Sequence, residues 1–146
     1  MLNAEPNKTI EQTLWIQAHP ETIWRFLTDP ERLAQWWGQA QVDARPHGPL
    51  RVQMHDGPRP VMRGHFLELV PHERIAFTFG WEPTPGAPDI PPGTSRVDIT
   101  LTPDGNGTKL TLRHSGLPAA LEDETNHGWA HLLNRLNHQA RRHHHN

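Results

Sequence analysis

Apolar and polar residues alternate along several short segments of this chain, a pattern typical of strands that bury one face. In the first segment, the apolar residues on one side are Ile10, Leu14, Ile16 and Ala18. Similar alternation recurs in 75–81, 97–101 and 110–114, and turn-forming clusters of Pro, Gly, Asn and Asp separate the segments. The pattern predicts an antiparallel meander with strands at 9–18, 50–54, 61–70, 75–81, 96–102 and 108–114.

The segment 61–70 does not alternate cleanly. Met62, Phe66 and Val70 have one parity, whereas Val61, Leu67 and Leu69 have the other. A β-bulge near Gly64 would place both sets on the buried face.

Two short helices are predicted after the first strand. Pro20 opens one, with Ile23, Phe26 and Leu27 facing inward. The second begins at Asp29-Pro30-Glu31, where Asp29 caps free amide groups and Pro30 presets the first helical φ. Trp36 and Trp37 follow Leu33 at helical spacing, so their rings share one face, and Gly38 permits the turn into the next strand.

The last element, 121–139, has helical periodicity. At roughly 100° per residue, one face carries Trp129, Leu132, Leu133 and Leu136. This face should pack across the sheet, giving an α+β fold. Gly128 lies beside it, where the missing side chain would allow a close approach of two backbones.

Composition narrows the function classes. The 146 residues suit one domain, and a net charge of −2 offers no general attraction for nucleic acid or anionic membranes. The absence of cysteine excludes disulfides and thiolate chemistry and fits a reducing compartment. No apolar run approaches the roughly 18 residues of a membrane span, and no signal peptide pattern is present. We therefore expect a cytoplasmic protein that has no nucleic-acid or membrane partner.

An ordered set of short motifs carries a family resemblance. The set comprises Ile16-x-Ala18-x-Pro20, Ile23-Trp24, Trp36-Trp37-Gly38, Gly64-x-Phe66-x-Glu68, Pro71-x-Glu73-x-Ile75-x-Phe77, His114-Ser115-Gly116 and His127-Gly128-Trp129. It resembles the START-like, helix-grip superfamily (SRPBCC), and most closely its activator of Hsp90 ATPase homologue-like branch. The resemblance covers about residues 9–136. It departs at Trp15, which projects from the polar side of its strand, and at the proline-rich segment 82–93.

The resemblance implies a curved antiparallel sheet wrapped around a long C-terminal helix, with an apolar cavity between them. We expect a single START-like domain over 1–146, with its core at about 9–139 and a disordered, His-rich tail at 140–146. The family name covers ligand carriers, cyclase-like enzymes and members without an assigned role, so the function must rest on a site.

An aromatic and methionine-rich set suggests the walls of that cavity. Its candidate members are Trp36, Trp37, Met54, Met62, Phe77, Phe79, Trp81, Trp129 and Leu133. Each of these residues, taken alone, is also explained by ordinary core packing. The segment 82–93 contains five prolines and would serve either as a stiff lid or as a passive connector.

His114 is the sharpest polar candidate, because its parity places it on the same face as Leu110 and Leu112. It would orient a ligand by a hydrogen bond, or it would be a buried imidazole satisfied by its neighbours. If Glu68 also faces the cavity, the two would form an acid–base pair, as in proteins that resemble polyketide cyclases or dehydratases. A surface salt bridge is the simpler explanation of Glu68.

Twelve histidines raise the question of a metal site. His127 and His131 have the spacing that brings two imidazoles to one ion. However, His127, His131 and His138 lie roughly opposite the apolar stripe of the predicted helix, so we expect them to face solvent. We expect no metal site and no cofactor. The terminal histidines His143, His144 and His145 are left out of the functional argument.

The leading hypothesis is a non-catalytic binding protein for a small hydrophobic molecule, aromatic or polycyclic. One alternative is a cyclase- or dehydratase-like enzyme that uses His114 and Glu68 in the same cavity. Another is an interaction module that stimulates a chaperone ATPase, with Trp15 or the His-lined helix face as the contact surface. Either a monomer or a homodimer fits the sequence.

Overall fold

The computed structural model describes residues 7–55 and 59–142. In chain order its elements are β1 (Asn7–Ile16), α1 (Pro20–Thr28), α2 (Pro30–Leu33), β2 (Gly38–Val42), β3 (Pro49–Met54), β4 (Val61–Val70), β5 (Arg74–Phe79), β6 (Ser95–Asp104), β7 (Gly107–Pro118), η1 (Ala119–Leu121) and α3 (Glu122–Arg142). All strand pairs are antiparallel, and the order across the sheet is β1-β7-β6-β5-β4-β3-β2. Among the described residues, no helix is long and apolar enough to cross a membrane.

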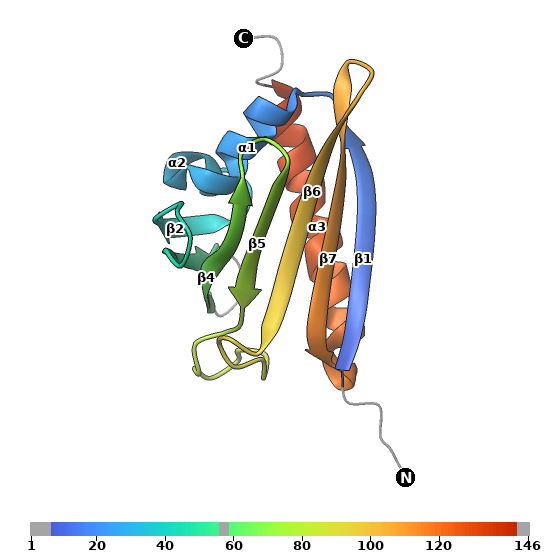
Figure 1. The fold of residues 1–146 in the computed structure, drawn as a ribbon. Coiled ribbons are helices and arrows are strands. Elements are labelled where there is room, and N and C mark those ends of the chain that lie inside the picture. The colour runs from blue at the N-terminus through green and yellow to red at the C-terminus, as the bar shows by residue number, and fades with distance from the viewer. Residues whose placement is uncertain (1–6, 56–58, 143–146) are drawn as a thin grey trace.

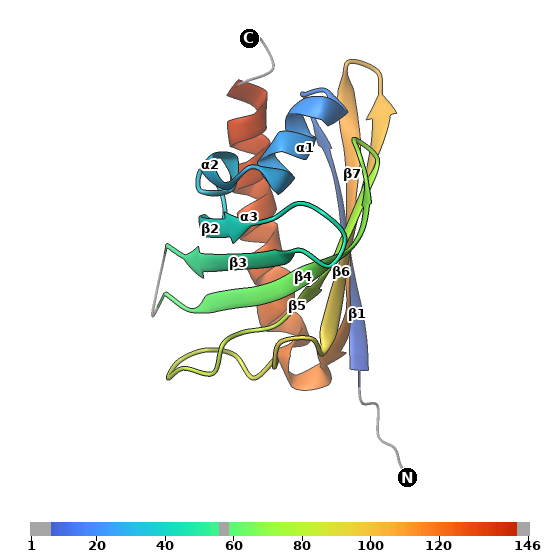
Figure 2. The ribbon, with the colours of Figure 1, turned by 60° about the vertical axis from the view of Figure 1, so that its left-hand side comes forward.

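The sheet bends around α3, as Figures 1 and 2 show from two sides. The helix lies along the concave face, with β1, β7 and β6 on one side and β3 and β4 curving past it on the other. Helix α1 contacts both α2 and α3 and covers the end of the sheet nearest the C-terminus. The predicted helix-grip α+β architecture is therefore confirmed.

The start of α2 follows from local chemistry. The Asp29 side chain accepts a hydrogen bond from the backbone N–H of Glu31 at 3.0 Å, and Pro30 occupies the first turn. The backbone N–H of Asp29 also donates to the Arg25 carbonyl, which closes α1. One residue thus ends the first helix and caps the second, as the predicted boundary at Asp29 requires.

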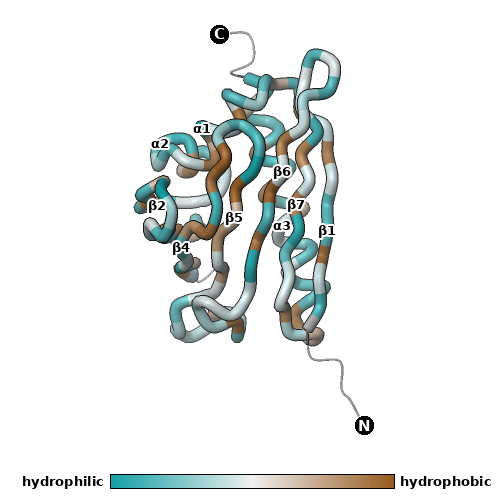
Figure 3. The backbone as a smooth tube through the Cα atoms, viewed as in Figure 1, coloured by the Kyte–Doolittle hydropathy of each residue, from teal (hydrophilic) through white to brown (hydrophobic). Residues whose placement is uncertain are grey.

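The alternating segments form strands that bury their apolar side. Figure 3 shows brown and teal positions following one another along β5, β6 and β7. On β6, Val97, Ile99 and Leu101 are buried, and their partners on β7 include the buried Leu110 and Leu112. The pattern did not predict β2, because Gly38–Val42 is short and has few apolar residues. Because β2 is an edge strand, it needs few apolar side chains.

The irregularity in β4 lies at a different residue from the one expected. The pairing with β5 shifts register between Phe66 and Glu68, so the bulge is at Leu67 and not near Gly64. Gly64 has another role, because a Cβ there would collide with the backbone carbonyl of Thr78 on β5. The glycine thus permits close contact between two strands.

Helix α3 buries Trp129, Leu132, Leu133, Leu136 and Ala140. The first four confirm the predicted stripe. The helix extends three residues beyond the predicted end at 139, so the tail prediction is wrong for 140–142. Ala140 explains the difference, since this small side chain is fully buried and continues the apolar face by one more turn. Residues 143–146 lie outside the described part of the chain.

Candidate ligand-binding cavity

A cavity of about 340 Å³ opens between the N-terminal half of α3, the end of β3 and the β5–β6 loop. It is lined by Trp37, Met54, His55, Pro60, Phe79, Trp81, Gly86, Pro88, Glu124, Thr125, Gly128, Trp129, His131, Leu132 and Arg135. Figure 2 shows why these segments meet, since the β5–β6 loop lies beside the first turns of α3. The cavity occupies one end of the helix only.

Aromatic rings form its inner wall. The ring centroids of Trp37 and Trp129 are 5.4 Å apart, and Phe79 lies 5.9 Å from Trp129. Trp81 meets Phe79 edge to face at 5.4 Å. These tilted arrangements hold each ring against its neighbours, so the wall is preformed. Such a surface suits a flat apolar molecule.

Five of the predicted residues border the cavity: Trp37, Met54, Phe79, Trp81 and Trp129. The other five do not, namely Trp36, Met62, Phe77, His114 and Leu133. These five are buried in the core. Packing alone accounts for their exposed fractions of at most 2%.

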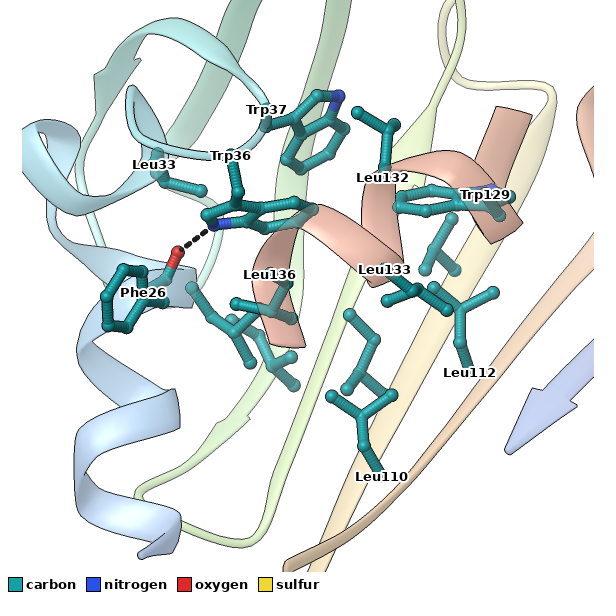
Figure 4. Packing of buried hydrophobic residues seen from close by; sticks show 14 of the residues in the cluster. Phe26, Leu33, Trp36, Trp37, Leu110, Leu112, Trp129, Leu132, Leu133 and Leu136 are labelled. Atoms are coloured by element: carbon teal, nitrogen blue, oxygen red, sulfur yellow. Dashed lines mark hydrogen bonds between the residues drawn. The ribbon is translucent and has the colours of Figure 1, made fainter. Parts of the chain in front are cut away.

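Trp36 shows how the packed core supports the wall. Its indole ring stacks on that of Trp37 with centroids 5.2 Å apart, and its Nε1–H donates to the Phe26 carbonyl at 2.8 Å. Figure 4 shows Trp36 between Phe26 and the apolar face of α3, below Trp37. The hydrogen bond fixes Trp36, and Trp36 in turn fixes the ring of Trp37 at the cavity.

His114 lies behind the wall in a fully paired environment. Its Nδ1 accepts a hydrogen bond from Trp129 Nε1–H at 3.0 Å, so in the neutral ring the proton is on Nε2. Nε2 lies 2.9 Å from Ser95 Oγ and donates to it, and Ser95 Oγ donates to the Phe79 carbonyl. Burial disfavours the charged ring and lowers the pKa of His114 to about 3. His114 therefore orients Trp129 and Phe79 as a neutral group.

Glu68 and His114 are not brought together. Glu68 is on β4 and His114 on β7, with β5 and β6 between them. Glu68 pairs across the sheet with Ala76 and shares its ion pair with Arg74 at 3.4 Å, on the face opposite His114. The acid–base pair of the enzyme hypothesis is thus not assembled.

The sequence interpretation missed the polar rim on α3. Glu124, Gly128, His131 and Arg135 border the cavity at intervals of three and four residues, so helical periodicity could have identified them as one face. His131 was expected to face solvent; it is exposed, but it also stands at the rim. His55, Pro60, Gly86 and Pro88 come from irregular segments whose position no periodicity encodes. In the described part of the chain, no three His, Asp or Glu side chains are grouped to hold a metal ion.

Gly128 borders the cavity from α3. A Cβ built there would meet no heavy atom within 4 Å. The expected close approach of two backbones at Gly128 is therefore wrong. The missing side chain faces open space at the middle of the cavity-lining face of α3.

The curved sheet, the gripped helix and the apolar cavity define a START-like, helix-grip protein. Within that class the chain belongs to the Activator of Hsp90 ATPase homolog 1-like protein family, whose model matches residues 17–140. The chain is 33% identical over 112 residues to the mouse (Mus musculus) Activator of 90 kDa heat shock protein ATPase homolog 1. That match covers 71% of this chain but only 31% of the mouse protein, so the chain spans about a third of that relative.

Solved structures support the assignment. An AHSA1-like protein from Rhizobium etli is 37% identical, with a TM-score of 0.70 over 92% of this chain and 82% of that one. A protein from Chromobacterium violaceum is 30% identical, with a TM-score of 0.74 over 91% of this chain and 96% of that one. The similarity therefore extends over nearly the whole domain.

Proposed function

We propose that this chain binds a small, largely apolar molecule, aromatic or polycyclic, in the cavity beside α3. The observation that carries the proposal is the open space at Gly128 within an aromatic wall. The volume of about 340 Å³ lies at the lower end of the range of roughly 300–1,000 Å³ that is common for small-molecule sites. It suits a ligand of about three fused rings.

The presence of glycine at position 128 supports a ligand-binding role for the cavity. Glycine in the interior of a helix costs roughly 1 kcal/mol relative to alanine, and here no neighbouring atom requires it. A packing explanation therefore does not account for Gly128. Room for a ligand does.

The β5–β6 loop forms one wall of the proposed site. The backbone N–H of Trp81 donates to the Ile90 carbonyl at 2.7 Å, and the Ile90 side chain is buried. This anchor holds Gly86 and Pro88 beside α3, where they border the cavity. The loop thus acts as a fixed wall whose prolines limit its movement.

Hydrogen bonding favours binding over catalysis at His114. Both of its ring nitrogens are paired with protein groups, and Glu68 lies on the other face of the sheet. The inner wall therefore offers stacking and apolar burial, which are properties of a carrier or sensor.

A titration with 1-aminoanthracene, whose fluorescence rises in apolar surroundings, tests the proposal. The wild type should bind this probe, and Gly128→Leu should weaken binding at least tenfold because the new side chain fills the cavity. Ala130→Leu is the matched control, since it adds the same side chain at an exposed position of the same helix. Equal binding by wild type and Gly128→Leu would refute the cavity as the binding site. If the wild type binds the probe and Gly128→Leu does not, native mass spectrometry of freshly purified protein would identify the natural ligand.

The similarity to the mouse protein supports a second candidate, stimulation of a chaperone ATPase. Trp15 is the exposed large hydrophobic residue of the described chain, with 46% of its surface accessible. Its Nε1–H donates to the Asp104 carbonyl, which holds the ring at the edge strand β1. A purified Hsp90-type chaperone should show faster ATP hydrolysis when the protein is added in excess, and Trp15→Ala should remove the increase. An unchanged ATPase rate with the wild type would reject this candidate.

A further inference from the structure

The cavity wall contains a hydrogen-bond donor that has no protein partner. Trp37 is 2% exposed and its Nε1–H makes no hydrogen bond. Within 7–55 and 59–142, the other buried side-chain polar atom without a partner is Asn137 Oδ1, which does not border the cavity. The ring that carries the unpaired donor therefore borders the cavity.

Neighbouring indoles show that pairing is the rule in this core. Trp36 Nε1–H donates to the Phe26 carbonyl, and Trp129 Nε1–H donates to His114 Nδ1. Both rings lie within 5.5 Å of Trp37 by their centroids. Since buried donors are rarely left unpaired, the exception at Trp37 calls for an explanation.

The orientation of the ring supplies one. In Figure 4 the nitrogen-bearing edge of Trp37 lies toward Leu132, which borders the cavity, and away from Trp36. The nitrogen itself is buried. Met54 borders the same cavity as Trp37, and a methionine side chain adapts to a bound ligand at low cost.

We infer that the ligand carries a hydrogen-bond acceptor, such as a ring carbonyl, that pairs with Trp37 Nε1–H. This inference rests on the proposed function and narrows it to oxygenated polycyclic molecules, for example ketones or quinones. The apolar rings of such a ligand stack on the aromatic wall, while its oxygen accepts the unpaired proton. Pure hydrocarbons of the same shape leave the donor unsatisfied and bind less tightly.

The test compares 9-fluorenone with fluorene, two flat tricyclic probes that differ by one carbonyl oxygen. Dissociation constants for both are measured on the wild type and on Trp37→Phe. Loss of ring area weakens both probes alike, whereas loss of the N–H weakens only fluorenone. The ratio of the two affinities should therefore fall by about three- to tenfold in Trp37→Phe.

Infrared spectroscopy of fluorenone on the wild type gives a second readout that does not depend on the variant folding. The bound carbonyl should absorb at lower frequency than in hexane, because hydrogen bonding weakens the C=O bond. An affinity ratio unchanged by Trp37→Phe, or a hexane-like carbonyl band, would overturn the inference.

The outcomes separate this inference from the proposed function. Binding of 1-aminoanthracene and of both tricyclic probes with no contribution from the carbonyl overturns only the role of Trp37. Failure of the wild type to bind any of the three probes overturns both.

Discussion

At the scale of single residues, the site depends on side chains that fix their neighbours. One ring nitrogen of His114 accepts a hydrogen bond from Trp129. The other donates to Ser95, which in turn donates to the Phe79 carbonyl. This arrangement requires one neutral tautomer, since a charged ring has no lone pair to accept the Trp129 proton. The protonation state of one imidazole therefore contributes to the shape of the cavity wall.

The lowered pKa of His114 predicts acid-sensitive stability. The pKa is about 3 in the folded chain and 6.5 as the ordinary value, so the unfolded state binds the proton more strongly. The stability that depends on neutral His114 is fully present above pH 6.5. It declines as pH falls toward 3, by about 1.4 kcal/mol per pH unit. Glutamine offers an acceptor and a donor but does not titrate. Urea unfolding should show that the wild type loses about 2 kcal/mol more than His114→Gln between pH 6.5 and 5.

Parallel loss of stability in the two proteins would contradict this assignment of the pH dependence. The remaining histidines are shared by both proteins, so their titration cancels in the comparison.

At the scale of elements, periodicity predicted the regular strands and helices that bury one face, but it did not predict the positions of irregular segments. The strands around Val97 and Leu110 and the stripe of α3 follow from periods of two and 3.6, because each buries one face. Five of the ten residues proposed for the site border the cavity, because the same periods place them on the buried faces. Whether a buried ring borders a hollow or fills the core depends on its neighbours in three dimensions, which is why Trp37 and Trp36 could not be separated from sequence.

Gly128 shows the limit most clearly. Sequence alone favours close helix packing as the reason for a glycine beside an apolar stripe, whereas the structure shows open space. Only the positions of the β5–β6 loop and of Pro60 relative to α3 distinguish close packing from open space at Gly128. These positions cannot be predicted from periodicity, because both segments are irregular.

Gly128 has open space beside it, whereas Gly64 lies against the backbone of β5, and this contrast gives a prediction. Gly128→Ala should stabilise the protein by about 0.5–1 kcal/mol, because alanine favours the helix and its methyl group meets nothing. Gly64→Ala is the contrasting control and should destabilise by about 1–3 kcal/mol, since its methyl group would collide with the Thr78 carbonyl. Urea unfolding of both variants at neutral pH measures the changes. A loss of stability in Gly128→Ala would show that the helix packs more tightly there than the structure indicates.

At the scale of the whole molecule, the cavity joins parts of the chain that are far apart in sequence. Trp37 follows α2, Met54 ends β3, Pro88 is in the β5–β6 loop and Leu132 is on α3. These segments also belong to, or pack against, one hydrophobic core. A ligand that contacts all of them should therefore stabilise the entire fold, and not only a local segment.

The ligand dependence of thermal unfolding tests this coupling. At ten times its Kd, 1-aminoanthracene should stabilise the fold by about 1.4 kcal/mol, which raises Tm by roughly 3–6 °C for a chain of this size. Ala130→Leu should keep the shift and Gly128→Leu should lose it, because only the second substitution fills the cavity. Hydrogen exchange at the same probe concentration should slow along α3 and in β5 together. A Tm shift that persists in Gly128→Leu would mean that the probe binds elsewhere, and slower exchange limited to the loop would mean that the cavity is not coupled to the core.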